Sequence, residues 1–257
     1  MKNLSILLSL IISFHVYSSV SIISDLDDTI KITNSDDEVD GTINAAFRSE
    51  VFTGVTEFFM GTKNYANEMH VLSASPIILR AKIEATLKKR HIDYTSLILK
   101  NVQSRETKFE YKVRAIKVLM EKNPDDFILI GDDVGEDPEA YGEIQLLYPN
   151  RILAIYIHVI KNRQIPAGTK YWTSFDLFLR EYTAKRMNPG WVEHASRTIL
   201  AEKELKKIIP DFADCPGSGN VWNWQTNVWP GNEAQLITTK ITGYCQVRNS
   251  SILTLQK

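Results

Sequence analysis

The sequence has few cysteines and almost no net charge, and both shortages exclude classes of function. Its 30 lysine and arginine residues are balanced by 31 acidic residues, so the formal net charge is −1. A nucleic-acid-binding surface usually needs an excess of basic residues, and this composition gives no reason to expect one. The chain of 257 residues has two cysteines. Their separation, with no Cys or His cluster nearby, is wrong for a tetrahedral zinc site.

The two cysteines, Cys215 and Cys245, lie in the C-terminal segment. In an oxidising compartment an even pair at this separation is expected to form a disulfide that closes the C-terminal segment on itself. Two free buried thiols are the alternative. The disulfide prediction therefore agrees with an exported protein.

Charge is also missing from the N-terminus, where no Asp, Glu, Lys or Arg occurs from Asn3 to Ser24. A basic start, an apolar run from Leu4 to Val16 and a small residue at Ser18 are typical of a cleaved signal peptide over residues 1–18. A membrane anchor is the alternative, but spanning a bilayer takes ~20 apolar residues. That length would consume Val20 to Ile23, which a buried strand needs. We therefore predict a periplasmic or secreted protein, with an uncleaved tether as the second possibility.

Residues 19–209 have the pattern of one α/β domain. Short apolar runs alternate with helical patterns, which predicts a doubly wound, mostly parallel sheet with helices on both faces. The expected strands are 20–24, 70–73, 96–99, 127–130 and 152–157. A first helix is expected from Ser75-Pro76, which suit an N-cap and the first helical position, to Arg90. Further helices are expected over 106–122, 175–185 and 191–209.

Residues 210–257 form a Trp-rich extension with a different pattern. Trp222, Trp224 and Trp229 lie among Asn, Gly and Pro residues, and the chain is rich in β-branched residues from Leu236 to Val247. We expect a small β-rich segment tied by the disulfide, either as an appendage or as a cover on the main domain. The tryptophans suit packing around the disulfide, and an anchor at a lipid interface is the alternative.

Two carboxylates, Asp25 and Asp27, directly follow the first expected strand. Ligands bind at the carboxyl ends of strands in open α/β sheets, and alternation along an extended chain places both side chains on one side. Two adjacent carboxylates repel each other, so a hard divalent cation such as Mg²⁺ would stabilise them. Such a pair can divide the work between a nucleophile and an acid–base group. An acidic turn that caps the next element is the alternative.

A second acidic cluster, Gly131 to Asp137, follows the strand at 127–130. The glycine allows a sharp turn towards a ligand, and Asp132, Asp133 and Asp137 supply more oxygens than a loop needs for capping. A solvated acidic loop is the alternative for this cluster alone. Taken with the first cluster, it indicates a metal and phosphate site.

A serine and a lysine complete the candidate site. Ser73 ends a strand, where its hydroxyl and nearby N–H groups can hold a phosphoryl oxygen, although a simple turn residue is the alternative. Lys112 falls on the apolar stripe of its helix, and a buried ammonium needs acidic partners, which Asp25 and Asp132 could provide. Lys108, one turn earlier, is the rival, and a lysine that extends to solvent is the remaining interpretation.

These motifs, in this order, resemble those of the haloacid dehalogenase superfamily of phosphohydrolases over roughly Val20 to Ile157. The resemblance implies that Asp25 forms a phospho-aspartyl intermediate. It also implies that Asp27 acts first as general acid and then as general base.

The same resemblance implies a Mg²⁺ ion and a phosphate-binding set. The implied metal ligands are Asp25, the main-chain carbonyl of Asp27 and Asp132, with Asp137 or Asp133 in support. The implied phosphate-binding residues are Thr29, Ser73 and Lys112.

A closer resemblance is to the catalytic domain of the actin-patch-associated phosphatidate phosphatases, with the lipins more distantly similar. It is carried by Ser24–Lys31, Leu72–Pro76, Lys112–Ile116 and Ile130–Tyr141. The resemblance implies Mg²⁺-dependent removal of phosphate from phosphatidate or related lipids, with transient contact to a membrane surface. Because only Thr33 to about Thr53 is free to form a flap, we expect no large cap. An open pocket of this kind suits large or membrane-bound phosphate esters.

Three other functions remain open at this point. A phosphatase of soluble esters, such as nucleotide or sugar phosphates, would use the same residues. A regulatory phospho-acceptor domain also combines clustered Asp, a hydroxyl and a lysine, but it carries its acceptor on a later strand and stays in the cytosol. An exported metal- or phosphate-binding protein without turnover would not need the intact pair of Asp25 and Asp27.

Overall fold

The computed structural model describes residues 19–35, 49–216 and 231–255. The predicted signal peptide at 1–18, most of the predicted flap, and Trp222, Trp224 and Trp229 lie outside these ranges. Among the helices that are described, none has the length and apolar character needed to cross a membrane.

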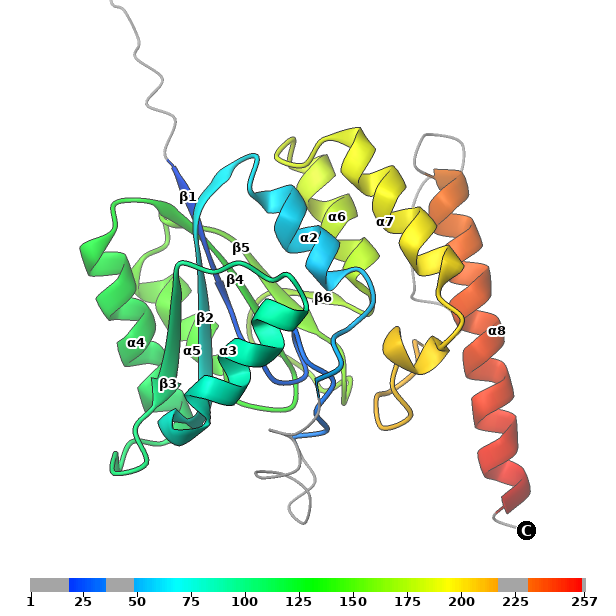
Figure 1. The fold of residues 1–257 in the computed structure, drawn as a ribbon, viewed down its shortest axis with the longest axis horizontal. Coiled ribbons are helices and arrows are strands. Elements are labelled where there is room, and N and C mark those ends of the chain that lie inside the picture. Colours follow the sequence, from blue (N-terminus) through cyan, green and yellow to red (C-terminus); the bar gives the residue numbers. More distant parts are fainter. Residues whose placement is uncertain (1–18, 36–48, 217–230, 256–257) are drawn as a thin grey trace, which may run out of the picture.

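A parallel six-stranded sheet forms the centre of the fold, in the order β3-β2-β1-β4-β5-β6 (Figure 1). The strands are β1 (Val20–Ser24), β2 (Ala66–Pro76), β3 (Ser96–Lys100), β4 (Asp126–Asp132), β5 (Ile152–His158) and β6 (Thr169–Tyr171). The chain builds outwards from β1 to β3 and then returns to β4 on the other side of β1. This reversal confirms the doubly wound prediction. The short edge strand β6 was not predicted.

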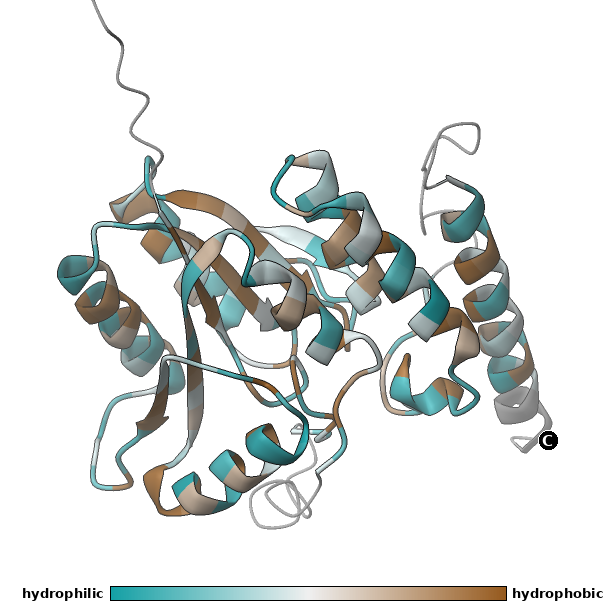
Figure 2. Cartoon of the chain, turned by 45° about the horizontal axis from the view of Figure 1, so that its top comes forward, coloured by the Kyte–Doolittle hydropathy of each residue, from teal (hydrophilic) through white to brown (hydrophobic). Residues whose placement is uncertain are grey.

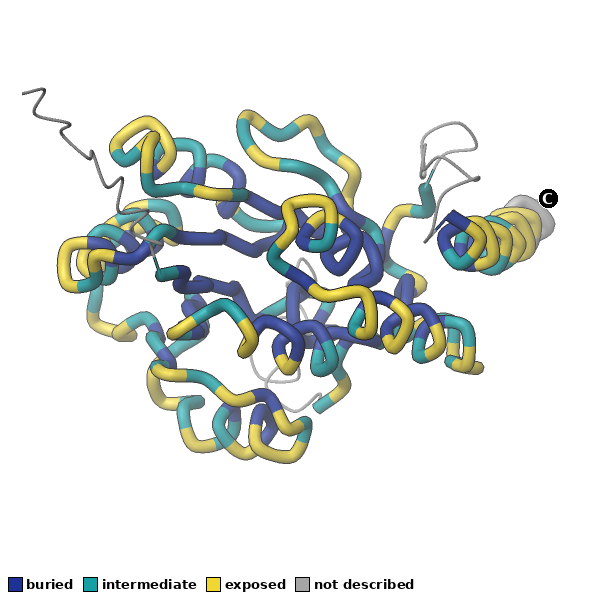
Figure 3. The backbone as a smooth tube through the Cα atoms, turned by 90° about the horizontal axis from the view of Figure 1, so that it is seen from above, coloured by how far each residue is buried: buried dark blue, intermediate teal, exposed yellow. Residues whose placement is uncertain are grey.

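Helices cover both faces of the sheet because neighbouring apolar residues of each strand point to opposite sides. Ile23 and Leu129 pack against α4 (Lys108–Lys122) and α5 (Asp137–Leu147). Ile22 and Ile128 belong to the opposite core. The helices that contribute to that core include α2 (Val55–Thr62), α3 (Arg80–Lys89), α6 (Ser174–Thr183) and α7 (Pro189–Ala201). Figure 3 shows the strands as buried tubes between helices whose outer sides are exposed.

Helix α4, which carries the predicted catalytic lysine, has a well-defined start. The Thr107 hydroxyl accepts the Glu110 N–H, and the Glu110 carboxylate accepts the Thr107 N–H at 2.8 Å. This reciprocal capping box satisfies two backbone donors that the first turn leaves free. It fixes the helix origin, and therefore the position of Lys112 one turn later.

Two helix boundaries differ from the sequence prediction by more than two residues. The helix expected from Ser75-Pro76, α3, begins only at Arg80, after a 3-10 turn η1 (Ile77–Leu79), because β2 continues until Pro76 pairs with Lys100 of β3. Helix α2 was not predicted. Helix α7 ends at Ala201 rather than 209. Its final carbonyl groups accept hydrogen bonds from the Lys240 ammonium, which stabilises the end of the helix.

The prediction of a β-rich C-terminal segment was wrong, because residues 231–255 form one helix, α8 (Gly231–Leu255). Its buried residues recur at helical spacing: Ala234, Ile237, Ile241 and Cys245. This stripe packs on α7 and joins the core of that face. Tertiary burial thus outweighs the β preference of the Thr and Ile residues. The segment is a cover on the main domain.

The predicted disulfide is confirmed, since Cys215 is bonded to Cys245. It ties the loop that follows α7 to the middle of α8. Arg248 adds hydrogen bonds from α8 to the carbonyl oxygens of Pro210 and Ala213. The C-terminal helix is therefore attached to the domain both covalently and by packing.

Replacing both Cys215 and Cys245 with serine should lower the free energy of unfolding by about 3 kcal/mol, because the disulfide closes a loop between residues 30 positions apart. Urea unfolding followed by circular dichroism measures this loss. Dithiothreitol should lower the midpoint of the wild type to that of the double variant and leave the variant unchanged. Equal midpoints for the oxidised wild type and the variant would contradict the assigned role.

Candidate active site

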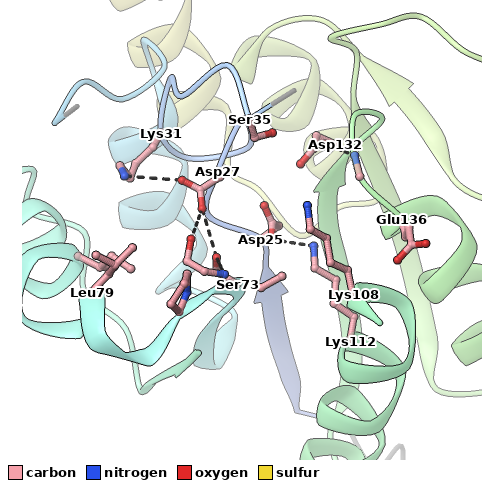
Figure 4. Close-up of a pocket in the computed structure, with 15 residues that line it drawn as sticks. Asp25, Asp27, Lys31, Ser35, Ser73, Leu79, Lys108, Lys112, Asp132 and Glu136 are labelled. Carbon is pink, nitrogen blue, oxygen red and sulfur yellow. Dashed lines mark hydrogen bonds and ion pairs between the residues drawn. The ribbon is translucent and has the colours of Figure 1, made fainter. Parts of the chain in front are cut away.

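The candidate site lies at the carboxyl ends of the strands, where the strand order reverses between β1 and β4. A pocket there is lined by side chains from several segments of the chain (Figure 4). Asp25 and Asp27 follow β1, Ser73 belongs to β2, Asp132 ends β4, and Lys112 comes from α4. Parallel strands end at a common edge, so the sheet brings together residues that are far apart in the sequence.

A buried lysine joins two of the carboxylates. The Lys112 ammonium lies 2.8 Å from Oδ1 of Asp25 and also forms an ion pair with Asp137. Burial alone would lower the pKa of Lys112, but the charges of Asp137, Asp25 and Asp132 outweigh burial and raise it. Lys112 therefore stays charged. Lys108, the rival lysine, is exposed at the rim of the pocket.

Three buried carboxylates surround one small volume. Oxygen atoms of Asp25, Asp132 and Asp137 all lie within 4.8 Å of one another. Burial, partly offset by Lys112, raises the pKa of Asp25, and the neighbouring carboxylates raise it further. Burial and the charge of Asp137 raise the pKa of Asp132 to about 8. Hard oxygen ligands with unrelieved mutual repulsion suit a divalent cation, so these residues fit the predicted metal site.

Asp27 points into the pocket and is held by hydroxyl groups. Its Oδ2 accepts hydrogen bonds from Ser75 at 2.7 Å and Ser73 at 3.2 Å, and its Oδ1 lies 3.6 Å from the Lys31 ammonium. The assignment of Ser75 as a helix N-cap was therefore wrong, because its hydroxyl binds Asp27 instead. The alternation of an extended chain, which puts Ser73 and Ser75 on one side, could have indicated this.

Sequence reasoning also missed the turn that shapes the pocket. Asp28 has a positive φ of 56°, and its carboxylate accepts the N–H groups of Thr33, Asn34 and Ser35. These bonds fold the chain back after β1. The turn carries the buried Lys31 to the pocket wall. A lysine three residues after a dense acidic run was the available signal.

The remaining predicted residues lie beside the pocket lining. Thr29 is buried and donates to Asp132 Oδ2 at 3.3 Å, so it orients an acidic residue. Asp133 does not belong to the acidic group, by which we mean the three carboxylates of Asp25, Asp132 and Asp137. Its Oδ1 instead accepts the N–H groups of Ile160 and Lys161. Of the two supporting ligands weighed from the sequence, Asp137 is the one in the group.

Gly131 permits the close approach of Asp137. A Cβ atom at Gly131 would lie 2.4 Å from the Asp137 carboxylate. The glycine is thus explained by the space that it leaves for this acid. The sequence interpretation, a sharp turn towards a ligand, does not apply, because Gly131 lies within strand β4.

A doubly wound sheet with paired aspartates after its first strand and a buried lysine beside them is the arrangement of a haloacid dehalogenase-type domain. The family model described as "Phosphatidate phosphatase APP1, catalytic domain" matches residues 20–159. The chain belongs to this family. The match contains β1 to β5 and every residue of the acidic group.

Two curated relatives are similar over a little more than half of the chain. The chain is 32% identical to phosphatidate phosphatase APP1 of Saccharomyces cerevisiae over 56% of its length and 26% of that protein. It is 28% identical to the uncharacterized protein C29B5.04c of Schizosaccharomyces pombe over 54% of its length and 25% of that protein. The chain therefore spans about a quarter of the length of these relatives.

Similar solved structures are more distant. The HAD domain of effector protein Lem4 from Legionella pneumophila covers 64% of this chain with 95% of its own, at 15% identity and a TM-score of 0.41. A chain of the Pnkp1/Rnl/Hen1 complex covers 61% of this chain with 47% of its own, at 18% identity and a TM-score of 0.40. These values are too low for the likeness to bear on function.

Asp132→Asn should change how stability depends on pH when no divalent cation is present. The folded state raises the pKa of Asp132 from 3.8 to about 8. Between these values the folded wild type holds a proton that the unfolded chain releases, so its stability falls as pH rises. The variant lacks this loss. The urea midpoint of the variant, compared with that of the wild type at the same pH, should therefore increase as the pH rises from 3.8 to about 8.

The measurement uses a chelator throughout. Mg²⁺ added at the basic end should restore stability to the wild type more than to the variant. Parallel pH dependences of the two proteins in chelator would show that Asp132 does not carry the raised pKa.

Proposed function

We propose that this chain is an exported, Mg²⁺-dependent phosphatase that hydrolyses phosphate monoesters, with phosphatidate or a related lipid phosphate as its preferred substrate. The observation that carries the proposal is the pairing of Asp25 with Asp27. Asp25 is fixed by Lys112 beside other carboxylates, whereas Asp27 is held by hydroxyls at the pocket surface. Two carboxylates in such different surroundings suit two different roles.

In the first step, an Asp25 carboxylate oxygen attacks phosphorus and the bond from phosphorus to the ester oxygen breaks. Asp27, protonated at this stage, donates its proton to the leaving oxygen. The products are the free alcohol and an acyl phosphate on Asp25. In the second step, water attacks phosphorus while Asp27 removes its proton. Inorganic phosphate leaves, and the Asp25 carboxylate is restored.

The other pocket residues bind and orient the phosphoryl group. Lys112 supplies a fixed positive charge, and the Ser73 hydroxyl is a donor on the opposite side. Thr29 acts through Asp132. A Mg²⁺ ion held by Asp25, Asp132 and Asp137, when bound, would neutralise negative charge on the phosphoryl oxygens.

The family and the pocket wall support a lipid phosphate as the substrate. The curated relative from Saccharomyces cerevisiae is named a phosphatidate phosphatase. In this chain, Pro76, Leu79 and Ile83 form an apolar wall beside the catalytic carboxylates. That wall suits the hydrocarbon part of a lipid next to its phosphate.

Two features support export. Residues 1–18 have the pattern of a signal peptide. The Cys215–Cys245 disulfide is of a kind that persists in oxidising compartments.

Asp25→Asn should abolish phosphate release, because an amide cannot attack phosphorus to form the acyl phosphate. Phosphate is measured from phosphatidate micelles, nucleotides and an aryl phosphate, with Mg²⁺ or chelator. The wild type should act on phosphatidate most efficiently and require the metal. Asp126→Asn is the matched control, because Asp126 is partly exposed and begins β4 at the end of the sheet away from the site.

Each assay arm tests a separate part of the proposal. Turnover by Asp25→Asn equal to that of the wild type would refute the nucleophile. Activity confined to nucleotides or the aryl phosphate would refute the lipid substrate. Full activity in chelator would refute the metal requirement.

Ser75→Ala should lower kcat about tenfold on phosphatidate with little change in KM, because the mutation removes the closest hydroxyl that orients Asp27. The defect should be smaller on an aryl phosphate, whose leaving group needs less help from an acid. Steady-state kinetics on both substrates measure this difference. Ser104→Ala, a hydroxyl in the loop before α4, is the control. Equal defects on the two substrates would assign Ser75 a structural role.

A further inference from the structure

Two exposed isoleucines lie at the rim of the candidate active site. Ile77 and Ile78 form most of the η1 turn and are 42% and 75% exposed. Their neighbours in the chain on either side, Pro76 and Leu79, line the pocket. A lone exposed apolar residue is ordinary, but two in succession beside a polar site mark an interaction surface.

A third exposed apolar residue lies on the adjacent loop. Pro76 of β2 pairs with Lys100 of β3, so the turn after β2 and the loop after β3 leave the sheet side by side. Val102, two residues into that loop, is 58% exposed. We call Ile77, Ile78 and Val102 the apolar rim. Figure 2 shows the η1 turn as a hydrophobic segment where β2 leads into α3.

Basic side chains lie behind the apolar rim, at the mouth of the pocket. Lys31 and the exposed Lys108 line the pocket. Lys82 lies in the first turn of α3, which follows the η1 turn directly. Apolar side chains in front of basic ones match the layering of an anionic lipid surface, where acyl chains lie below phosphate groups.

We infer that the apolar rim docks on the surface of a lipid bilayer or micelle that contains an anionic phosphate lipid, and that the lipid enters the pocket from this side. The inference rests on the proposed lipid substrate. Leu79 and Ile83 continue the apolar surface from the rim towards Asp25. A lipid phosphate could thus reach Asp25 while its acyl chains remain in contact with apolar protein.

Ile78→Asp tests the surface, with Leu146→Asp as the matched control. Leu146 is 79% exposed near the C-terminal end of α5, and α5 begins at the catalytic edge, so Leu146 lies away from the rim. Both variants gain the same charge at an equally exposed position. Ile78→Ser provides a milder change if the aspartate prevents folding, and circular dichroism confirms the fold of each protein.

Binding is measured by co-sedimentation of the full chain, carrying Asp25→Asn to prevent turnover, with phosphatidylcholine vesicles that contain phosphatidate. Ile78→Asp should weaken binding about tenfold, because an isoleucine that becomes buried in the lipid on docking is replaced by a charge. Leu146→Asp should bind as the parent does. Lys82→Glu should weaken binding to phosphatidate vesicles, whereas Lys88→Glu, exposed near the end of the same helix, should not.

Turnover with an intact Asp25 separates docking from catalysis. Ile78→Asp should lose about tenfold in rate on vesicular phosphatidate and keep the wild-type rate on monodisperse short-chain phosphatidate. A matching loss on the short-chain substrate would place Ile78 in the pocket and overturn the docking surface. Equal behaviour of Ile78→Asp and Leu146→Asp on vesicles would also overturn it.

Two further outcomes would separate the docking surface from dimerisation and from the proposed function. Light scattering that shows a wild-type dimer, converted to a monomer by Ile78→Asp, would assign the rim to a second copy of the chain and overturn lipid docking. Absence of phosphate release from every substrate would refute the proposed function. Vesicle binding that still depends on Ile78 would in that case leave the docking surface standing.

Discussion

The ion pairs between Lys112 and its carboxylates are the constraint on which the site depends. A buried ammonium is tolerated only with acidic partners, and buried carboxylates only with a cation. Lys112 meets Asp25 and Asp137, but a third buried carboxylate, Asp132, lies in the same group, so three acids share one lysine. The fold therefore holds an excess of negative charge at this edge, and this excess is the physical reason for assigning a divalent cation to it.

The second aspartate, Asp27, has surroundings that differ from those of the buried carboxylates. Asp27 lies only two residues from Asp25, but it is partly exposed and is surrounded by hydroxyls and one lysine. The turn organised by Asp28 produces this difference, because it directs the chain away from the buried edge immediately after β1. In the proposed mechanism, one short acidic run thus supplies a fixed nucleophile, a proton carrier and a structural residue.

The parts of the fold that could be predicted are those where local pattern and burial agree. The strand at 20–24 is mostly apolar and is buried throughout, and its predicted bounds are those of β1. The failures occur where a distant contact decides the outcome. Ser75 suits an N-cap locally, but Asp27 and the pairing of Pro76 keep it in β2. In α8, a buried helical stripe outweighs the β-branched composition that predicted strands.

The same distinction holds within the site. The acids and Lys112 could be named from the sequence because charged residues next to apolar strands and on an apolar helix stripe need each other. The apolar rim could not be predicted, because the sequence does not show whether an isoleucine is exposed or buried. Only the structure shows that Ile77 and Ile78 are exposed. A charged site closed within the protein could not reach a phosphate held at a lipid surface. The apolar rim would give the buried charges access to such a phosphate, because it places the mouth of the pocket against the lipid surface.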